Sequence, residues 1–185
     1  MPQSVKGTDL MALRQTLANR QWLPDPRCAQ LNPAWLTQWD APALALQTTR
    51  LYLMPEFSVY SLTSVYPTPA GSFGAGLTHT GWNAYSANRF YVAYGRQVNP
   101  ALSVGSGFQL EQQRIAGLSR SVTWAGILGC NLQLNQQFSG QFMLSGNQTV
   151  LARSATSPVN WKWGAGLDCR FSEQSIFSFS VWQEP

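Results

Sequence analysis

A chain of 185 residues is long enough for one domain with a buried core, but only 11% of its residues are charged, against roughly 25% in ordinary soluble domains. The net charge of +4 comes from scattered arginines without any basic run, which argues against a nucleic-acid-binding protein. The 44% hydrophobic content argues against a disordered chain, and the absence of an apolar run of about 18 residues argues against a transmembrane helix.

The first 42 residues differ from the rest and are expected to form an N-terminal, hatch-like segment. Residues 8–20 carry a weak helical pattern, and a proline-punctuated stretch follows up to residue 42. No apolar run typical of a signal peptide is visible, so an exported chain is expected to be a mature form, to have a replaced leader or to be a truncated product.

From residue 43 onward the pattern predicts antiparallel strands. Apolar and polar or small residues alternate with a period of two, which indicates half-buried strands. Nine strands are predicted, over residues 43–53, 56–66, 71–82, 89–98, 101–112, 121–135, 138–148, 161–171 and 175–182. Most are longer than the five or six residues common in globular proteins, and match the roughly 9–11 residues that cross a bilayer.

The two faces of the central hairpin, residues 89–110, differ in an unusual way. One face carries Phe90, Val92, Tyr94, Leu102, Val104, Phe108 and Leu110. The other carries Gly95, Ser103, Gly105, Gly107 and Gln109, where a soluble surface would usually place charge. Because strands in hydrocarbon must close into a barrel, the first set is expected to face lipid and the second a lumen. The strands of a soluble β-barrel or β-sandwich also alternate between apolar and polar residues, so a soluble β protein stays open as an alternative.

The connections between the strands alternate in length. Short turns are expected at 67–71, 99–101, 135–137 and 172–174, and longer loops at 81–86, 113–120 and 149–160. This arrangement is typical of bacterial outer-membrane barrels, and it places Asn99-Pro100 on the periplasmic side. Aromatic residues near the strand ends fit interfacial girdles.

Polar residues on the second face are the candidates for a lumen lining. They are Arg89, Gln109, Glu111, Asn131, Gln133, Lys162, Asp168 and Arg170. Such charges tune selectivity in channels, or else pair with one another or with the N-terminal segment. His79, the only histidine, is expected to be packed or interfacial, because the sequence identifies no Ser or Asp as its catalytic partner. We therefore expect no catalytic site and no enzyme.

No cofactor or metal site is expected either. The three cysteines lack the spacing of metal ligands, and the Gly-x-Gly pairs precede no helix that would bind a nucleotide. Whether Cys130 and Cys169 pair stays open, because their strands need not be close.

The motifs LNPAWL (31–36) and RLYLMPEFSVYSLTSVYPTPAGSFGAG (50–76) carry a resemblance to a known family. The first resembles the Asn-Pro-Ala-Gly-Leu hatch motif of FadL-like outer-membrane proteins, with Trp35 in place of the glycine. The second, with the Ala-Tyr-Gly strand that follows, resembles the PorV/PorQ-like branch of the Bacteroidota. The resemblance covers about residues 28–182.

The resemblance implies an up-and-down transmembrane β-barrel of about fourteen strands in the bacterial outer membrane, with Asn32, Pro33 and Ala34 in a hatch inside the lumen. Family members act in uptake of small hydrophobic molecules or as non-transporting accessories of type IX secretion. The accessory role would use the loops 81–86, 113–120 and 149–160 to dock partner proteins. Nine strands and the ending VWQEP suggest a barrel shortened at its C-terminus, or a small barrel of eight or ten strands.

Overall fold

The computed structural model describes residues 26–50, 58–82, 85–117, 120–135, 137–151, 157–172 and 175–183. Two short 3-10 helices, η1 (Pro26–Gln30) and η2 (Pro33–Gln38), precede the strands. The strands are β1 (Ala43–Arg50), β2 (Ser58–Thr68), β3 (Gly71–Gly81), β4 (Tyr85–Asn99), β5 (Leu102–Ile115), β6 (Ser121–Gln133), β7 (Phe138–Leu151), β8 (Asn160–Ser172) and β9 (Ser175–Gln183). The predicted helix over residues 8–20 lies outside the described ranges.

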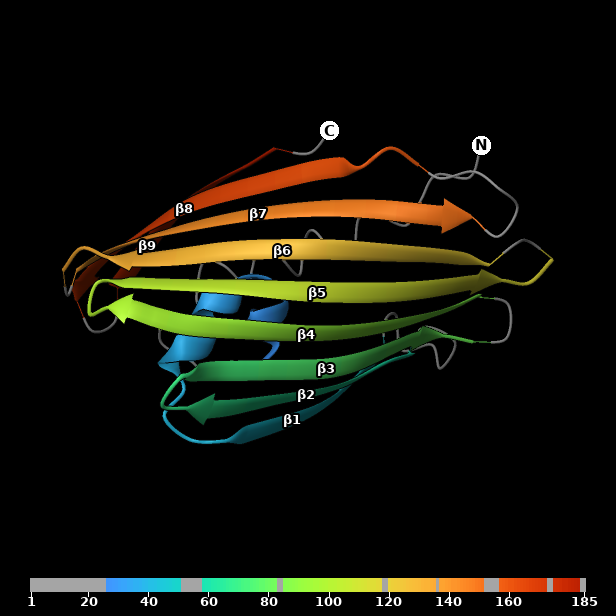
Figure 1. Cartoon of the computed structure of the whole chain (residues 1–185), viewed down its shortest axis with the longest axis horizontal. Coiled ribbons are helices and arrows are strands. Elements are labelled where there is room, and N and C mark those ends of the chain that lie inside the picture. The colour runs from blue at the N-terminus through green and yellow to red at the C-terminus, as the bar shows by residue number, and fades with distance from the viewer. Residues whose placement is uncertain are drawn as a thin grey trace.

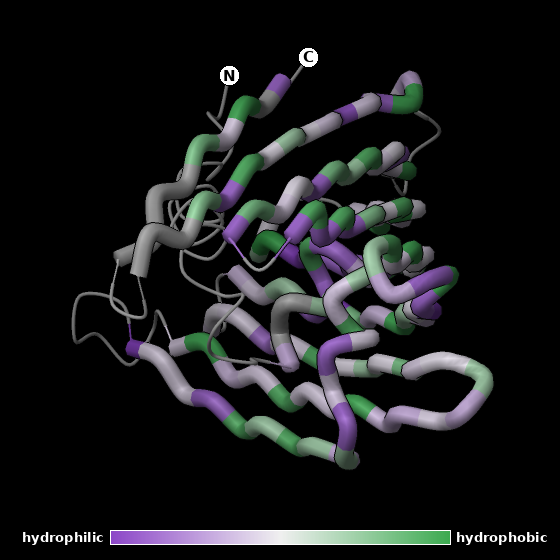
Figure 2. The backbone as a smooth tube through the Cα atoms, turned by 90° about the vertical axis from the view of Figure 1, so that its left-hand side faces the viewer, coloured by the Kyte–Doolittle hydropathy of each residue, from purple (hydrophilic) through white to green (hydrophobic). Residues whose placement is uncertain are grey.

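The strands form one antiparallel meander in the order β1 to β9 (Figure 1). This confirms the predicted all-β, up-and-down arrangement. Each strand pairs with the strands next to it in the sequence, and the sheet curves into an arc that is open on one side (Figure 2). The described ladders include no pairing between β1 and β9, so the predicted closed barrel is not seen. The nine strands curve too little to bring β1 and β9 next to each other (Figure 2).

The predicted division of residues between two faces is confirmed. Along β4 the inward Tyr91 and Ala93 are 2% and 7% exposed, whereas the outward Phe90 and Val92 are 42% and 40% exposed. Figure 2 shows the same alternation of apolar and polar residues along the strands. In this fold the small residues therefore face the concave side, and the large apolar residues cover the outer side.

Asparagine side chains form the tight turns at one end of the sheet, which we call the turn end. Asn99 Oδ1 accepts hydrogen bonds from the backbone N–H groups of Ala101 and Leu102, at 2.9 and 2.7 Å. Asn135 Oδ1 accepts in the same way from Phe138, at 2.7 Å. Asparagine favours such turns because its side chain replaces a backbone acceptor. The longer connections lie at the opposite, loop end, although strand pairing extends into all three predicted loops, to Tyr85, Ile115 and Leu151.

The two short helices lie against the concave face near the turn end (Figure 1). We call residues 26–38 the plug segment. Its η2 helix contacts β3, β4, β5 and β6. The buried core of the molecule forms at this contact, where Ala29 and Leu36 pack with Val65, Tyr91 and Ala93 of the sheet. Among the described residues, no helix has the length and apolarity to span a membrane.

Candidate functional site

Three glycines on neighbouring strands form the seat of the plug segment. Gly95, Gly105 and Gly129 lie directly opposite one another on β4, β5 and β6. A Cβ atom at Gly95 would lie 2.5 Å from the Pro33 carbonyl oxygen, and one at Gly105 would lie 2.5 Å from the Ala34 nitrogen. Because real Cβ atoms do not approach backbone so closely, only glycine lets the plug segment reach the wall at this row. We call these residues the glycine row.

Asn32 fixes the plug segment to the sheet. Its Oδ1 accepts from the Ala34 N–H at 3.1 Å and caps η2, and its Nδ2 donates to the Cys130 carbonyl of β6 at 3.3 Å. Asn32 is 2% exposed, and its bond from Ala34 is fully buried. The Thr37 and Ser103 hydroxyl oxygens, 2.9 Å apart, add a contact to β5. Asn32, Pro33 and Ala34, predicted as hatch residues, thus lie on the concave face against β4, β5 and β6 near the turn end.

A polar row lines the loop-end half of the concave face. It runs across six neighbouring strands through Ser61, Thr78, Arg89, Glu111, Thr123 and Thr149. Arg89 donates to Glu111 Oε2 from both Nε, at 2.8 Å, and Nη2, at 2.7 Å. The Thr123 and Thr149 hydroxyl oxygens lie 2.8 Å apart. Since the two charges cancel, this part of the wall offers hydroxyl groups and a compact ion pair rather than a net charge.

The other predicted lumen residues follow the same parity but lie apart. Gln109 is half-buried next to the polar row, opposite Tyr91, and Asn131 is buried near the plug segment. Gln133 is exposed at the end of β6. Lys162 and Asp168 are half-buried on β8, where Asp168 lies 3.5 Å from Gln141 Nε2. The Arg170 side chain lies outside the described part of the structure. Within the predicted set, Arg89 and Glu111 lie together as an ion pair.

Sequence reasoning missed several polar members of the concave wall. Thr78, Thr123, Thr149 and Gln141 lie on it with the predicted residues. The parity of a predicted lumen residue, on the same strand or on the paired strand, is shared by Thr78, Thr123 and Gln141, whereas Thr149 lies in a segment predicted as a loop.

The outer face shows an equally ordered arrangement. A row of polar residues crosses five strands near the loop end, through Thr48, Tyr60, His79, Asn88 and Gln112. Two residues further toward the turn end, every outward residue on six strands is apolar: Leu46, Leu62, Leu77, Phe90, Leu110 and Trp124. These side chains are between 38% and 79% exposed. We call the first set the polar rim and the second the apolar row.

The apolar band continues toward the turn end and has a measurable height. Below the apolar row lie Val92 and Phe108, and then an aromatic group in which Tyr66, Phe73 and Tyr94 are neighbours. On β4 the apolar band is bounded by Asn88 toward the loop end and by Arg96 toward the turn end. Those eight residue steps correspond to about 27 Å along the strand, or about 20 Å after a strand tilt of about 40°.

In the described part of the chain, neither His79 nor the cysteines Cys130 and Cys169 form a recognisable reactive site. His79 is exposed at the polar rim, where its Nδ1 lies 2.7 Å from Asn88 Oδ1 and donates to that oxygen. Cys130 and Cys169 are free. Strand β7 separates them, because Cys130 lies opposite Phe142 and Cys169 opposite Phe138. Among the residues that the structure describes, no three His, Cys, Asp or Glu side chains are grouped as metal ligands would be.

Comparisons with protein-family models, with curated proteins and with solved structures find no match to this chain.

Proposed function

We propose that this chain is an outer-membrane β-barrel protein whose outer face contacts lipid and whose concave face lines the interior. The observation that carries the proposal is the alignment of the apolar row beneath the polar rim. A bilayer presents a sharp boundary between headgroups and hydrocarbon, and a band about 25 Å tall is typical of transmembrane barrels. The estimated 20 Å is close to this value. A soluble β-barrel that binds a ligand inside would not expose leucine, phenylalanine and tryptophan side by side across six strands.

The interior fits passage or binding of small hydrophobic or amphipathic molecules, as the resemblance to FadL-like proteins implies. On the loop-end side of the glycine row, the concave face of β6 carries Ala125 and Ile127, both buried and apolar, while Tyr91 and Ala93 of β4 pack against the plug segment. An apolar wall with a few polar groups is the usual lining of a small-molecule site. The paired Arg89 and Glu111 lie at the loop-end mouth of this wall, where an amphipathic molecule would meet a polar group first.

A second candidate function is supported by the plug segment itself. Residues 26–38 lie on the concave face near the turn end, and Asn32 links them to β6 through its hydrogen bond to the Cys130 carbonyl. A permanently filled interior suits an accessory protein that docks partners through its loops, at 81–86, 113–120 and 149–160, without transporting anything. Partner docking of the type IX secretion kind is then the function, and the barrel serves as an anchor.

Insertion into vesicles tests the membrane proposal with two matched variants. Phe108 lies in the middle of the apolar band and Gln112 on the polar rim, both outward on β5. In a bilayer, Phe108→Arg places a charge near the midplane and is expected to destabilise the inserted protein by about 2–4 kcal/mol, whereas Gln112→Arg near the interface costs about 0–1 kcal/mol. Urea titration of protein folded into phosphatidylcholine vesicles measures both values.

The proposal fails if the purified chain stays monodisperse without detergent, or if the two arginine variants unfold at the same urea concentration. Single-channel conductance and uptake of a hydrophobic dye then separate the two candidate functions. Conductance or dye uptake supports passage of small molecules. A sealed interior with a stably co-purifying partner supports the accessory role.

A further inference from the structure

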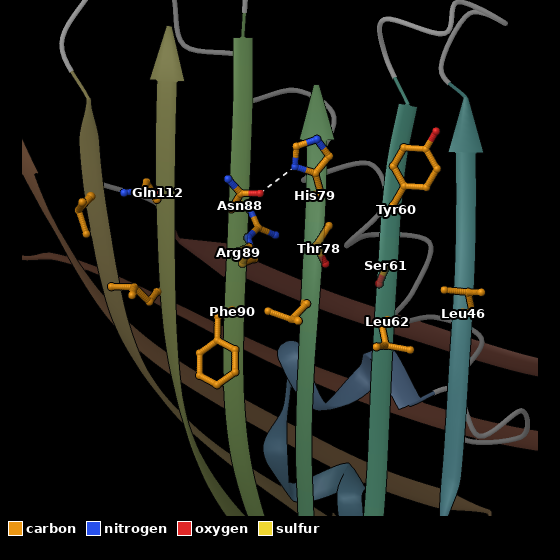
Figure 3. A pocket seen from close by; sticks show the side chains of 13 residues that line it. Leu46, Tyr60, Ser61, Leu62, Thr78, His79, Asn88, Arg89, Phe90 and Gln112 are labelled. Atoms are coloured by element: carbon orange, nitrogen blue, oxygen red, sulfur yellow. Dashed lines mark hydrogen bonds between the residues drawn. The ribbon is translucent and has the colours of Figure 1, made fainter. Parts of the chain in front are cut away.

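A shallow trough lies on the outer face of β1 to β6 near the loop end, with a volume of about 510 Å³ (Figure 3). The plug segment lies behind the sheet in this view, so the trough opens away from the interior. Its floor is formed by the members of the apolar row on β1 to β5, with Leu62, Leu77 and Phe90 at the centre. The volume falls within the usual range for small-ligand sites, about 300–1,000 Å³.

The upper end of the trough is polar and rich in hydrogen-bond donors. His79, Asn88 and Gln112 line it, and Tyr60 lies beside them (Figure 3). The bond from His79 Nδ1 uses the Asn88 oxygen, so the Asn88 amide nitrogen remains a donor. Arg114 follows Gln112 on the same face of β5, one row closer to the loop end, and is exposed.

The charged side chain next to the polar rim is a cation, Arg114. Over β2 to β5 the described residues contain a single carboxylate, Glu111, and it points to the concave side, where it pairs with Arg89. Arg114 therefore faces no acidic neighbour on the outer surface of these four strands. A guanidinium with amide donors beside it is suited to a phosphate group, because phosphate accepts several hydrogen bonds at once.

We propose that the trough binds a membrane amphiphile, with its acyl chain on Leu62, Leu77 and Phe90 and its anionic phosphate headgroup at Asn88, Gln112 and Arg114. The inference rests on the proposed membrane function, since an acyl chain reaches the trough only if the outer face is in contact with lipid. Two features fix the direction of the ligand. The apolar floor lies toward the middle of the band, and the donors lie at its loop-end boundary, so the headgroup lies toward the loops.

The test measures binding of three probes to the detergent-solubilised full chain by native mass spectrometry. The probes are oleoyl lysophosphatidate, oleoyl lysophosphatidylcholine and inorganic phosphate. Arg114→Gln and Leu77→Ala perturb the rim and the floor. Each has a matched control on the same outer face, away from the trough. Arg96→Gln removes an exposed arginine at the turn end of β4, and Leu128→Ala truncates a leucine of β6 that is 57% exposed, against 54% for Leu77.

We expect the wild-type chain to prefer lysophosphatidate to lysophosphatidylcholine. Arg114→Gln should weaken lysophosphatidate binding about three- to tenfold and reduce that preference. Leu77→Ala should weaken both lysolipids by about threefold or more through lost apolar contact. Arg96→Gln and Leu128→Ala should leave binding unchanged.

Three results would overturn the inference. Equal affinity for the two lysolipids refutes an anionic headgroup site, and full competition by inorganic phosphate shows a free-phosphate site without an acyl chain. Equal effects of the trough variants and their controls show unspecific coating by amphiphile. Each of these results leaves the membrane proposal standing if the chain still requires detergent. A chain that is monodisperse in plain buffer refutes the proposed function instead.

Discussion

Replacing Gly105 with valine tests whether the plug segment is held on the concave face by close backbone contact. A Cβ at this position would lie 2.5 Å from the Ala34 nitrogen and 2.7 Å from Pro33 Cβ. Neither neighbour is the flexible end of a side chain, so the plug segment must move. Overpacking of this kind costs about 1–3 kcal/mol. If the segment leaves the sheet altogether, the lost burial of Trp35 and Leu36 raises the cost to about 3–6 kcal/mol.

Gly126→Val is the matched control, because it lies on the neighbouring strand β6 and nothing is within 4 Å of the Cβ it would carry. Its unfolding free energy should stay within about 0.5 kcal/mol of the wild type. Two assays apply to both variants: urea unfolding in detergent followed by tryptophan fluorescence, and the rate of chymotrypsin cleavage near Trp35. We expect Gly105→Val to unfold at lower urea and to be cleaved faster. Equal stability and equal protection in the two variants would refute the assigned role of the glycine row.

Three further substitutions test individual contacts. Asn32→Ala removes the cap of η2 and the hydrogen bond to Cys130, and should lower the unfolding free energy measured by urea titration by about 1–3 kcal/mol. Gln38→Ala, at an exposed position, serves as the control, and equal urea midpoints for the two variants would contradict the role of Asn32. Tyr94→Phe removes a 2.6 Å hydrogen bond to the Ala70 carbonyl and should cost about 0.5–1.5 kcal/mol, with Tyr60→Phe near zero in the same titration. Glu111→Gln removes the negative partner of Arg89, and we expect the reversal potential measured in planar bilayers with asymmetric KCl to shift toward chloride selectivity. The double variant Arg89→Gln/Glu111→Gln should return the reversal potential to the wild-type value. An unchanged reversal potential in the single variant would place the ion pair outside a conducting path.

The nine strands and their two faces could be predicted from sequence because local information was sufficient. Alternation with a period of two determines which side of a strand each residue occupies. The asparagines at 99 and 135 mark turns through bonds that they make to residues two and three positions further on. Neither feature depends on which strand lies next to which.

The rows across the sheet could not be predicted in the same way. His79, Asn88 and Gln112 are far apart in the sequence, and they lie at one level because turn geometry fixes the register of β3, β4 and β5. The glycine row has the same origin, since its three members come from three strands. The strand ends also depend on partners: Tyr85 joins β4 because Ile115 lies opposite it.

Trp35 shows how a motif can be recognised while its packing is not. In sequence the residue is only a departure from the glycine of the hatch motif. In the structure it is 7% exposed within the plug segment, so the large ring contributes burial that a glycine would not. Periodicity carries no information about this contact, because the plug segment has no regular repeat.

The number of strands in the meander has a consequence for how the sheet can close. Each strand reverses the direction of the one before it, so β1 and β9 run the same way. Direct contact between them would produce a parallel seam, with slanted and evenly spaced hydrogen bonds, in an otherwise antiparallel structure. A closed barrel that is antiparallel throughout needs an even strand total, and this sheet therefore reaches it only by gaining an odd number of strands between β9 and β1.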